Sequence, residues 1–473
     1  MSGATLADLG LLVPELILVG MALVLVLLAR RLQRAPVAIV GTVLAALAAA
    51  LVASWDLSVG TRTGFGGMIT LDGYSQFFKV LIGVTLALTA LLSVTSSHRE
   101  QVPRAEYHVL LLLASTGMML AVSALDLLTL YLGLELMTLC SYILVGIRVE
   151  RPTSNEAAIK YFLLGSFASA LLLYGISLTY GVTGATDFAA VASALFRQDI
   201  GSNPLLLAAI GLVFAGLAFK VSAVPFHAWA PDAYQGASAP VAAFLAAGSK
   251  ATGLAVLGRM CLVAFGPVAH VLSVFLAGLA VLSIVVGSFI ALSQTDMKRL
   301  LAYSSIAHVG YALLGLLTGT SEGISATMMY AFFYVFMTLG TFGVVIALGE
   351  RGERLDGYQG LAVQRPGTAV LMLIFLLSLT GIPPTAGFMA KFVVMMSAVR
   401  AGYVVLVVLA AACSVVTAFV YMRVAVLMYM KEPQEKAPSR FPIAVSAALA
   451  VAALVTVIGG ISPGILAPWL VSP

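Results

Sequence analysis

The sequence has 473 residues, of which 61% are hydrophobic and 10% are charged, and its formal net charge is +5. Soluble domains carry about 25% charged residues, so this composition excludes a soluble globular protein. It predicts an all-α polytopic membrane protein. The net positive charge does not indicate a nucleic-acid partner, because the basic residues follow a membrane-topology pattern.

Fourteen apolar segments are long enough to cross a bilayer, which takes about 20 residues of α-helix. The first is followed by arginines and has no small-residue cleavage site, so we interpret it as a retained span. The sequence therefore predicts about fourteen transmembrane helices. Their centres lie near residues 20, 45, 85, 114, 136, 168, 214, 250, 280, 309, 336, 380, 415 and 451.

Basic residues are unevenly distributed over the loops between these segments. One set of alternate loops holds 16 of them, and the other holds only Arg62, Arg197, Arg259 and Arg400. Because Lys and Arg gather on the cytoplasmic side of a membrane, the larger set predicts the cytoplasmic loops and places both termini outside. The larger set comprises Arg30, Arg31, Arg34, Arg99, Arg104, Arg148, Arg151, Lys298, Arg299, Arg351, Arg354, Arg365, Arg423, Lys431, Lys436 and Arg440.

The five basic residues left over lie within predicted spans, and all five are lysines: Lys79, Lys160, Lys220, Lys250 and Lys391. A charge at the bilayer centre costs about 2.5–3.5 kcal/mol even on a lenient scale. Lysine can release its proton when it is removed from water, whereas arginine effectively cannot. The lysines are therefore candidates for proton transfer. Lys79 is the exception, because it and Glu15 lie near span ends, where we expect both side chains to snorkel to the interface.

The seventh span is interrupted beside one of these lysines. Pro225 cannot donate a backbone hydrogen bond and clashes with the carbonyl of Val221, the residue after Lys220. The polar connector that follows contains His227. A broken helix and a charge at one place need protein or water around them, because lipid satisfies neither.

The twelfth span is interrupted in the same way. Pro383 and Pro384 free the carbonyls of Leu379 and Thr380, and Lys391 follows about two turns later. Gly387, four residues before Lys391, leaves a surface without a side chain. We expect water to reach the lysine there.

Glu135, in the fifth span, is the only acidic residue that we place at mid-membrane. We expect it to pair with an intramembrane lysine, since buried charges are usually paired, although a protonated lone carboxyl is the alternative. Glu156 and Lys160 have the i,i+4 spacing of a helical ion pair. That pair is either structural or part of a proton entry route, and His308 is either an interhelical hydrogen-bond partner or a proton carrier.

The order of the spans indicates an internal symmetry. Spans 4–8 and 9–13 form two groups of five, and the broken helix is fourth in each group. Because five is odd, the groups cross the membrane in opposite senses, as inverted repeats of transporters do. We therefore divide the chain into an N-terminal three-helix segment (1–104), two five-helix repeats (105–265 and 266–430) and a C-terminal span (431–473).

Four stretches of this sequence resemble the antiporter-like membrane subunits of respiratory complex I and related cation/proton antiporters. They read LYLGLEL, FKVSAVPFHAWAPDAYQGASAP with a downstream SK, DMKRLLAYSSIAHVGY and GIPPTAGFMAKF. The resemblance is strongest from residue 105 to 400. It implies fourteen helices with two inverted repeats, and proton translocation in which Glu135 pairs with Lys220, Lys250 is a central relay and Lys391 faces the exit.

The resemblance also implies what lies elsewhere. The chain would be one subunit of a proton-pumping NADH:quinone oxidoreductase in the bacterial inner membrane, with no redox chemistry of its own. NAD, FMN, the iron–sulfur clusters and the quinone would belong to partner subunits, and no cofactor or metal to this chain. Alternatives are a subunit of a multisubunit sodium–proton antiporter or a membrane-bound hydrogenase, or a purely structural membrane subunit.

Overall fold

The computed structural model describes residues 6–32, 37–56, 60–99, 104–197, 203–434 and 441–470. Within these ranges the chain is almost entirely helical, and 12 helices are long and apolar enough to cross a membrane. Arg34, Lys436 and Arg440, which we assigned to cytoplasmic loops, lie outside the described residues. The prediction of an all-α polytopic membrane protein is confirmed.

Each of the fourteen predicted centres falls within a helix. Two of these helices come in addition to the 12: α14, whose first turn carries Lys298 and Arg299, and α18, which has only 15 residues. The helices are α2 (Val13–Leu32), α3 (Val37–Asp56), α4 (Gly73–Arg99), α5 (Arg104–Ser123), α6 (Leu127–Val145), α7 (Pro152–Thr183), α9 (Pro204–Val221), α12 (Lys250–Arg259), α13 (Ala269–Leu292), α14 (Met297–Leu316), α15 (Ser321–Leu348), α18 (Pro366–Thr380), α20 (Val404–Met430) and α21 (Ile443–Ile461).

The remaining elements are connectors between these helices or further parts of interrupted spans. Strands β1 (Arg62–Gly64) and β2 (Ile69–Leu71) form an antiparallel hairpin in which Thr63 faces Thr70. The others are α1 (Leu6–Leu9), η1 (Gly10–Leu12), η2 (Phe65–Gly67), α8 (Phe188–Phe196), α10 (Trp229–Gly236), α11 (Ala239–Phe244), η4 (Leu245–Ser249), η5 (Met260–Ala264), η6 (Gly266–Val268), α16 (Glu350–Glu353), η7 (Asp356–Tyr358), α17 (Leu361–Gln364), α19 (Ala386–Arg400) and η8 (Pro463–Trp469). Parts of interrupted spans are α11, η4 and η5 beside α12, and α19 after α18.

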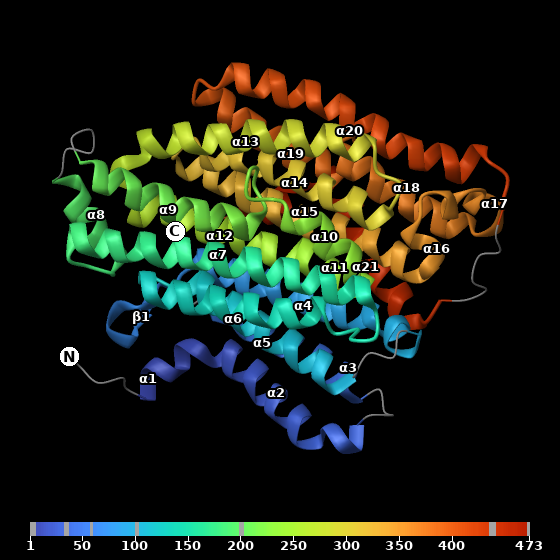
Figure 1. Ribbon diagram of the computed structural model, residues 1–473, viewed down its shortest axis with the longest axis horizontal. Helices are drawn as coiled ribbons and strands as arrows, with labels where there is room; N and C mark the ends of the chain where they lie inside the picture. The colour runs from blue at the N-terminus through green and yellow to red at the C-terminus, as the bar shows by residue number, and fades with distance from the viewer. Residues whose placement is uncertain are drawn as a thin grey trace.

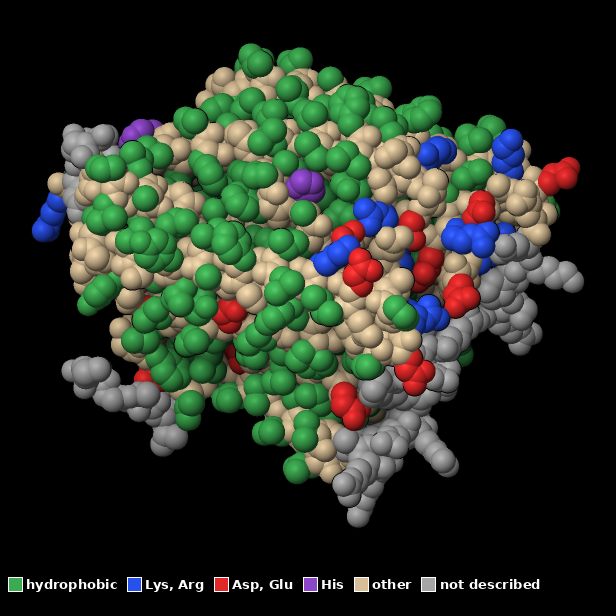
Figure 2. Space-filling view, viewed as in Figure 1, with side chains coloured by type: hydrophobic (Ala, Val, Ile, Leu, Met, Phe, Trp, Pro, Cys, Tyr) green, Lys and Arg blue, Asp and Glu red, His purple; other side chains and the backbone are tan. Residues whose placement is uncertain are grey.

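The elements separate by end as the loop charges predict. In Figure 1, β1 and α8 lie at the left-hand end of the bundle, while α16 and α17 lie at the right-hand end. The first pair belongs to predicted external loops and the second pair to predicted cytoplasmic ones. On the face in Figure 2, hydrophobic side chains cover the middle and charged side chains gather toward the right-hand end.

Burial identifies the helices at the centre of the bundle. The span Ala239–Ala264 is 100% buried and Ser321–Leu348 is 94% buried, whereas Val404–Met430 is only 28% buried. A helix that is apolar all round must lie inside the protein or face lipid. The first two therefore form the core, whereas most of the surface of α20 lies on the outside of the bundle.

The two predicted helix breaks are present. Helix α9 ends at Val221, where Ser222 adopts a left-handed conformation (φ 59°). Helix α18 ends at Thr380, and Gly381 (φ 88°) occupies the same left-handed region, which suits glycine. The eighth span contains two π-helical turns that the sequence did not indicate, η4 before Lys250 and η5 after Arg259.

Two of our expectations about charged residues near the membrane interfaces are wrong. Lys79 is fully buried and lies 2.8 Å from Glu15, whose side chain is 6% exposed. The pair neutralises itself between α2 and α4, so neither side chain snorkels. Lys298, which we placed in a cytoplasmic loop, is buried in the first turn of α14, where it pairs with Glu353 at 2.8 Å.

Two further expectations are corrected by close packing. Arg259 is no loop residue but the buried last residue of α12, paired with Asp72. The gap in front of Gly387 is closed, because a Cβ there would lie 1.8 Å from the carbonyl oxygen of Ser378. Water therefore does not reach Lys391 through that gap. The inverted repeats and the division into segments remain predictions.

Candidate functional site

Lys220 lies in an ionic cluster between α6, α7 and α9. The ammonium nitrogen of Lys220 lies 3.2 Å from Glu135 Oε1 and also donates to Thr138 Oγ1 (3.3 Å) and Ser169 Oγ (3.2 Å). The Ser169 hydroxyl in turn donates to the Glu135 carboxylate. The predicted Glu135–Lys220 pair is therefore present, and two hydroxyl groups complete it.

Close packing of α7 against α9 builds this cluster. A Cβ at Gly216 would lie 2.6 Å from Leu172 Cβ, so the two helices approach at a distance that only glycine permits. Small residues allow this kind of contact between membrane helices. Gly216 lies one turn before Lys220, and Ser169 lies on the facing turn of α7. The small residues thus determine which hydroxyl the lysine meets.

Lys250 binds the end of the broken helix α9. Its ammonium nitrogen donates to the carbonyl of Val221 at 2.6 Å and to the hydroxyl of Ser222. The Val221 carbonyl is the one that Pro225 leaves without a partner. The ammonium also lies 5.1 Å from the ring centroid of Trp229, within the range of a cation–π interaction.

Lys391 makes the corresponding contact at the second helix break. Its ammonium nitrogen donates to the carbonyl of Thr380, the last residue of α18, at 2.8 Å. It also donates to Ser414 Oγ at 3.3 Å and lies 4.5 Å from the ring centroid of Tyr311. At both helix breaks a buried ammonium group therefore binds the C-terminal carbonyl of a broken helix, where the helix dipole favours a cation.

A polar connection extends from Lys391 toward the centre of the bundle. The hydroxyl of Ser414 donates to the hydroxyl of Tyr311 at 2.9 Å, and the Tyr311 ring packs against the ring of His308. His308 Nδ1 lies 2.6 Å from the Tyr330 hydroxyl. His308 is thus an interhelical hydrogen-bond partner close to the groups that bind Lys391. This position is compatible with a structural hydrogen bond and with a role as a proton carrier.

The accessory residues of the first half lie apart from these clusters. His227 is half-buried between α9 and α10, and its Nδ1 atom has no hydrogen-bond partner among the described residues. The predicted pair of Glu156 and Lys160 is present at 2.7 Å but largely exposed. Lys160 also reaches Asp232 at 3.1 Å, and Arg299 donates to the same carboxylate at 2.7 Å.

This exposed network lines an open hollow of about 410 Å³ at the end of the bundle that we predict to be cytoplasmic. The network joins α7, α10 and α14 through the carboxylate of Asp232. Although partial burial raises the pKa of Asp232, its hydrogen bonds with Arg299 and Lys160 hold that pKa below its ordinary value. Asp232 is therefore ionised at neutral pH and can hold both cations.

Sequence reasoning missed most of the neutral partners in these clusters. Ser169, Ser222 and Ser414 each bind a lysine or its carboxylate partner, yet serine is common in membrane helices and carries no spacing signal. The described residues contain no group of three or more His, Cys, Asp or Glu side chains that could hold a metal ion. The polar groups that these clusters bring together are amines, carboxylates, hydroxyls and backbone carbonyls.

A bundle of apolar helices with lysines buried at two helix breaks defines an antiporter-like membrane subunit. A family described as NADH:quinone oxidoreductase/Mrp antiporter matches residues 124–417. The chain belongs to this family, as the motifs predicted.

Several named relatives cover nearly the whole chain. NADH-quinone oxidoreductase subunit N of Desulfovibrio desulfuricans is 46% identical over 98% of this chain and 96% of its own length. A subunit N of Rhizobium meliloti is 43% identical over 95% and 94% of the two chains.

Solved structures agree with these relatives. A chain of respiratory complex I from Thermus thermophilus has 34% identity and a TM-score of 0.83, covering 97% of this chain and 99% of that one. A chain of the Mrp complex from Dietzia has a TM-score of 0.85 over 97% and 96% of the two chains, with 22% identity, which shows the shared fold alone.

Proposed function

We propose that this chain is the proton-translocating N-type membrane subunit of an NADH–quinone oxidoreductase. The observation that carries the proposal is the repeated arrangement at the two helix breaks. In each, a buried lysine binds a freed backbone carbonyl and a serine hydroxyl. A lysine held by neutral groups can lose and regain its proton without leaving a counter-charge unpaired.

The residues have distinct roles in this proposal. Lys220 alternates between a charged state paired with Glu135 and a neutral state that has passed its proton to Lys250. Lys391 passes the proton to the exit side. Glu156 and Lys160, with His227 and His308, are accessory groups on the entry route and between the clusters.

The energy for pumping comes from partner subunits. Other membrane and peripheral subunits of the complex oxidise NADH and reduce quinone, and they hold FMN and the iron–sulfur clusters. This chain performs no redox chemistry and contributes the proton pathway within a bacterial cytoplasmic membrane, with both termini outside. Its exposed apolar faces contact lipid and neighbouring membrane subunits.

The first alternative is a subunit of a multisubunit sodium–proton antiporter or of a membrane-bound hydrogenase. This alternative is considered because the chain shares its fold with a chain of the Mrp complex. The second alternative is a structural subunit that conducts no ion. It predicts that neutral replacements of the lysines reduce assembly without reducing pumping by the complexes that remain.

The test uses inverted membrane vesicles from cells in which the gene is deleted and then restored. NADH-driven quinone reduction and proton pumping should disappear with the deletion and return with the wild-type chain. Lys250→Met and Lys391→Met should assemble but pump poorly per assembled complex. Normal pumping by both variants would support the structural alternative, and sodium–proton exchange without NADH would support the antiporter.

A further inference from the structure

The segment that carries Lys250 lies between two π-helical turns. Helix α12 begins at Lys250 and ends at Arg259, with η4 directly before it and η5 directly after it. A π turn contains an extra residue relative to an α turn and often occurs at functional sites. Moving such a turn by one residue would rotate the segment by about 100° and carry Lys250 away from its partners.

A buried ion pair holds the far end of this segment. Arg259 donates from Nη1 to Asp72 Oδ2 at 2.7 Å and from Nη2 to Asp72 Oδ1 at 2.9 Å. The side chain of Arg259 is 2% exposed and that of Asp72 is 16% exposed. A bidentate pair of this kind specifies orientation as well as distance, so it constrains the rotation of α12 about its own axis.

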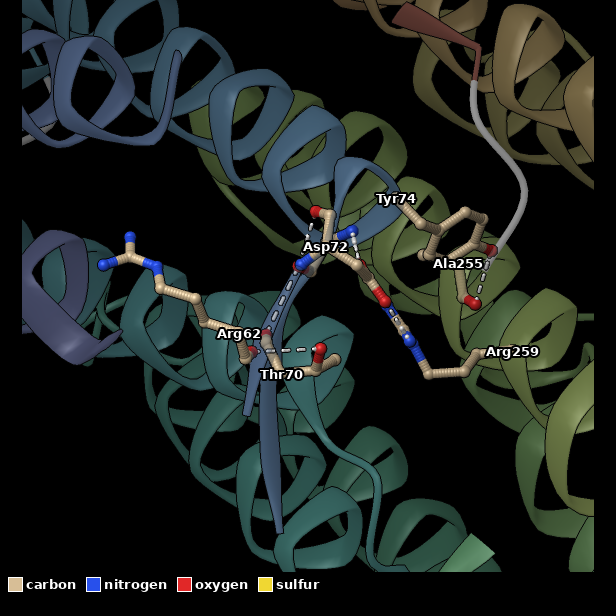
Figure 3. A network of polar contacts seen from close by, with 7 residues as sticks. Arg62, Thr70, Asp72, Tyr74, Ala255 and Arg259 are labelled. Carbon is tan, nitrogen blue, oxygen red and sulfur yellow. Dashed lines mark hydrogen bonds and ion pairs between the residues drawn. The ribbon is translucent and has the colours of Figure 1, made fainter. Parts of the chain in front are cut away.

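Tyr74 adds two contacts to the same turn of α12. The Arg259 guanidinium lies 5.0 Å from its ring centroid, and its hydroxyl donates to the carbonyl of Ala255 at 2.7 Å (Figure 3). A Cβ at Gly258 would lie 2.5 Å from the Tyr74 hydroxyl oxygen, so glycine makes room for the ring. The side chain and the backbone of α12 are thus both fixed at this end.

The other side of the contact is rigid because of the hairpin that precedes α4. Asp72 directly follows β2 and accepts a hydrogen bond from the backbone N–H of Ser75 at 2.7 Å, within the first turn of α4. Burial by itself raises the pKa of Asp72. The hydrogen bond and the charge of Arg259 lower that pKa by more, so it lies below its ordinary value and the carboxyl stays ionised. Figure 3 shows the hairpin and α12 joined through this carboxylate.

Lys250 and Arg259 are nine residues apart, which corresponds to about 13 Å along an α-helix. The ammonium of Lys250 must stay within hydrogen-bonding distance of Val221 and Ser222, so the rotation of α12 about its own axis has to be held. We propose that Asp72 and Arg259 are positioning residues, which clamp α12 from the outer hairpin so that Lys250 meets the end of α9. This inference rests on the proposed role of Lys250.

The test compares clamp variants in the assembled complex in inverted vesicles, with protons pumped per electron as the readout. Arg259→Gln and Asp72→Asn should lower this ratio by at least about twofold, and Arg259→Lys, which keeps the charge but not the bidentate geometry, should recover part of it. The matched control is Glu322→Gln, which breaks an exposed ion pair with Arg400 at the same end of the bundle. It should leave the ratio unchanged.

A wild-type ratio in Arg259→Gln, with only less complex assembled, would overturn the clamp. If Arg259→Gln does not assemble, Tyr74→Phe is the deciding variant, because it removes only the hydroxyl bound to Ala255. A normal ratio of protons pumped per electron in Tyr74→Phe rejects the clamp, and a reduced ratio supports it. Lys250→Met separates the two proposals. Normal pumping by Lys250→Met rejects the proposed role of Lys250 as a relay. If Lys250→Met fails to pump while Arg259→Gln and Asp72→Asn pump normally, only the clamp is rejected.

Discussion

The ammonium nitrogen of Lys250 lies 2.6 Å from the carbonyl oxygen of Val221, the last residue of α9. Lys391 stands in the same relation to Thr380, the last residue of α18, at 2.8 Å. A helix C-terminus carries unpaired carbonyls and about half a negative charge. Each helix break therefore provides the partner of a lysine that otherwise has no acidic residue within ion-pair distance in the described structure.

Ser222 offers a way to separate this contact from stability. Its left-handed conformation is disfavoured for residues other than glycine by about 1–2 kcal/mol, while a hydrogen bond to a charged group such as the Lys250 ammonium contributes about 1.5 kcal/mol at the lower end of its usual range. Ser222→Gly should therefore assemble normally, because the two changes offset each other. Proton pumping per assembled complex should fall, since Lys250 loses its hydroxyl partner. Wild-type pumping would show that the hydroxyl has no part in proton transfer.

Lys220→Arg distinguishes a titrating lysine from a fixed charge. Arginine keeps the positive charge beside Glu135 but does not release a proton in a protein. We expect this variant to assemble and yet to pump poorly, close to Lys220→Ala. Proton pumping and electron transfer in vesicles, normalised to assembled complex, provide the measurement. Near-wild-type pumping by Lys220→Arg would mean that Lys220 only neutralises the carboxylate.

Glu135→Gln should impair pumping more than Glu135→Asp. The aspartate keeps the negative charge that stabilises protonated Lys220, although its shorter side chain lengthens the 3.2 Å contact. The glutamine amide oxygen can still accept a hydrogen bond from Lys220, but the buried ammonium then has neutral partners only. Pumping rates of the two variants in inverted vesicles test this order, and equal rates for Glu135→Gln and the wild type would contradict the pairing.

Asp232→Asn tests the exposed network at the hollow. The variant should lose no more than about 1 kcal/mol of stability, because exposed ion pairs contribute little. The difference from wild type should shrink as salt rises from 0.1 to 1 M, where the screening length falls from about 10 to about 3 Å. Thermal inactivation of the complex at several salt concentrations measures this difference in stability. A difference that does not depend on salt would mean that side-chain packing, and not the ion pairs, causes it.

The pH dependence of this contribution has a definite sign. Because the pKa of folded Asp232 is lowered, its stabilisation is fully present above the unfolded value of about 3.9 and is lost as the pH falls through the folded value. Between pH 6 and 8 the difference between Asp232→Asn and the wild type should therefore stay constant. A change within that range would assign the effect to another group.

The orientation of the bundle can be tested by labelling single cysteines in intact cells. Labels near Arg62 and Arg197 should react from outside, and labels near Arg351 and Lys431 should react only after the membrane is opened. The excess of basic residues in one set of loops motivates this assignment. Reaction of position 431 from outside would place that loop on the external face and reverse the proposed topology.

The helices and the helix breaks were predictable because they depend on local properties. The length of an apolar segment determines whether it can cross a bilayer. A proline inside a helix interrupts it, as Pro225 and Pro384 do here. That Glu135 pairs with some buried lysine was also predictable, since a buried acid and a buried lysine are each costly alone, whereas Lys220 as its partner was implied by the resemblance to the antiporter-like family. These features follow from the chemistry of single residues or of close neighbours.

Only the tertiary structure decided which groups meet across the bundle. Arg259 and Asp72 are 187 residues apart, and Lys220 and Ser169 are 51 apart. Lys79 and Lys298 are buried because acidic partners on other helices approach them, which their own surroundings in the sequence do not reveal. The sequence by itself determined the spans, their breaks and the burial of Lys220, Lys250 and Lys391. The packing of glycine-containing helix faces decided which carbonyl, hydroxyl or carboxylate each lysine binds, because those contacts depend on distances between segments remote in the chain.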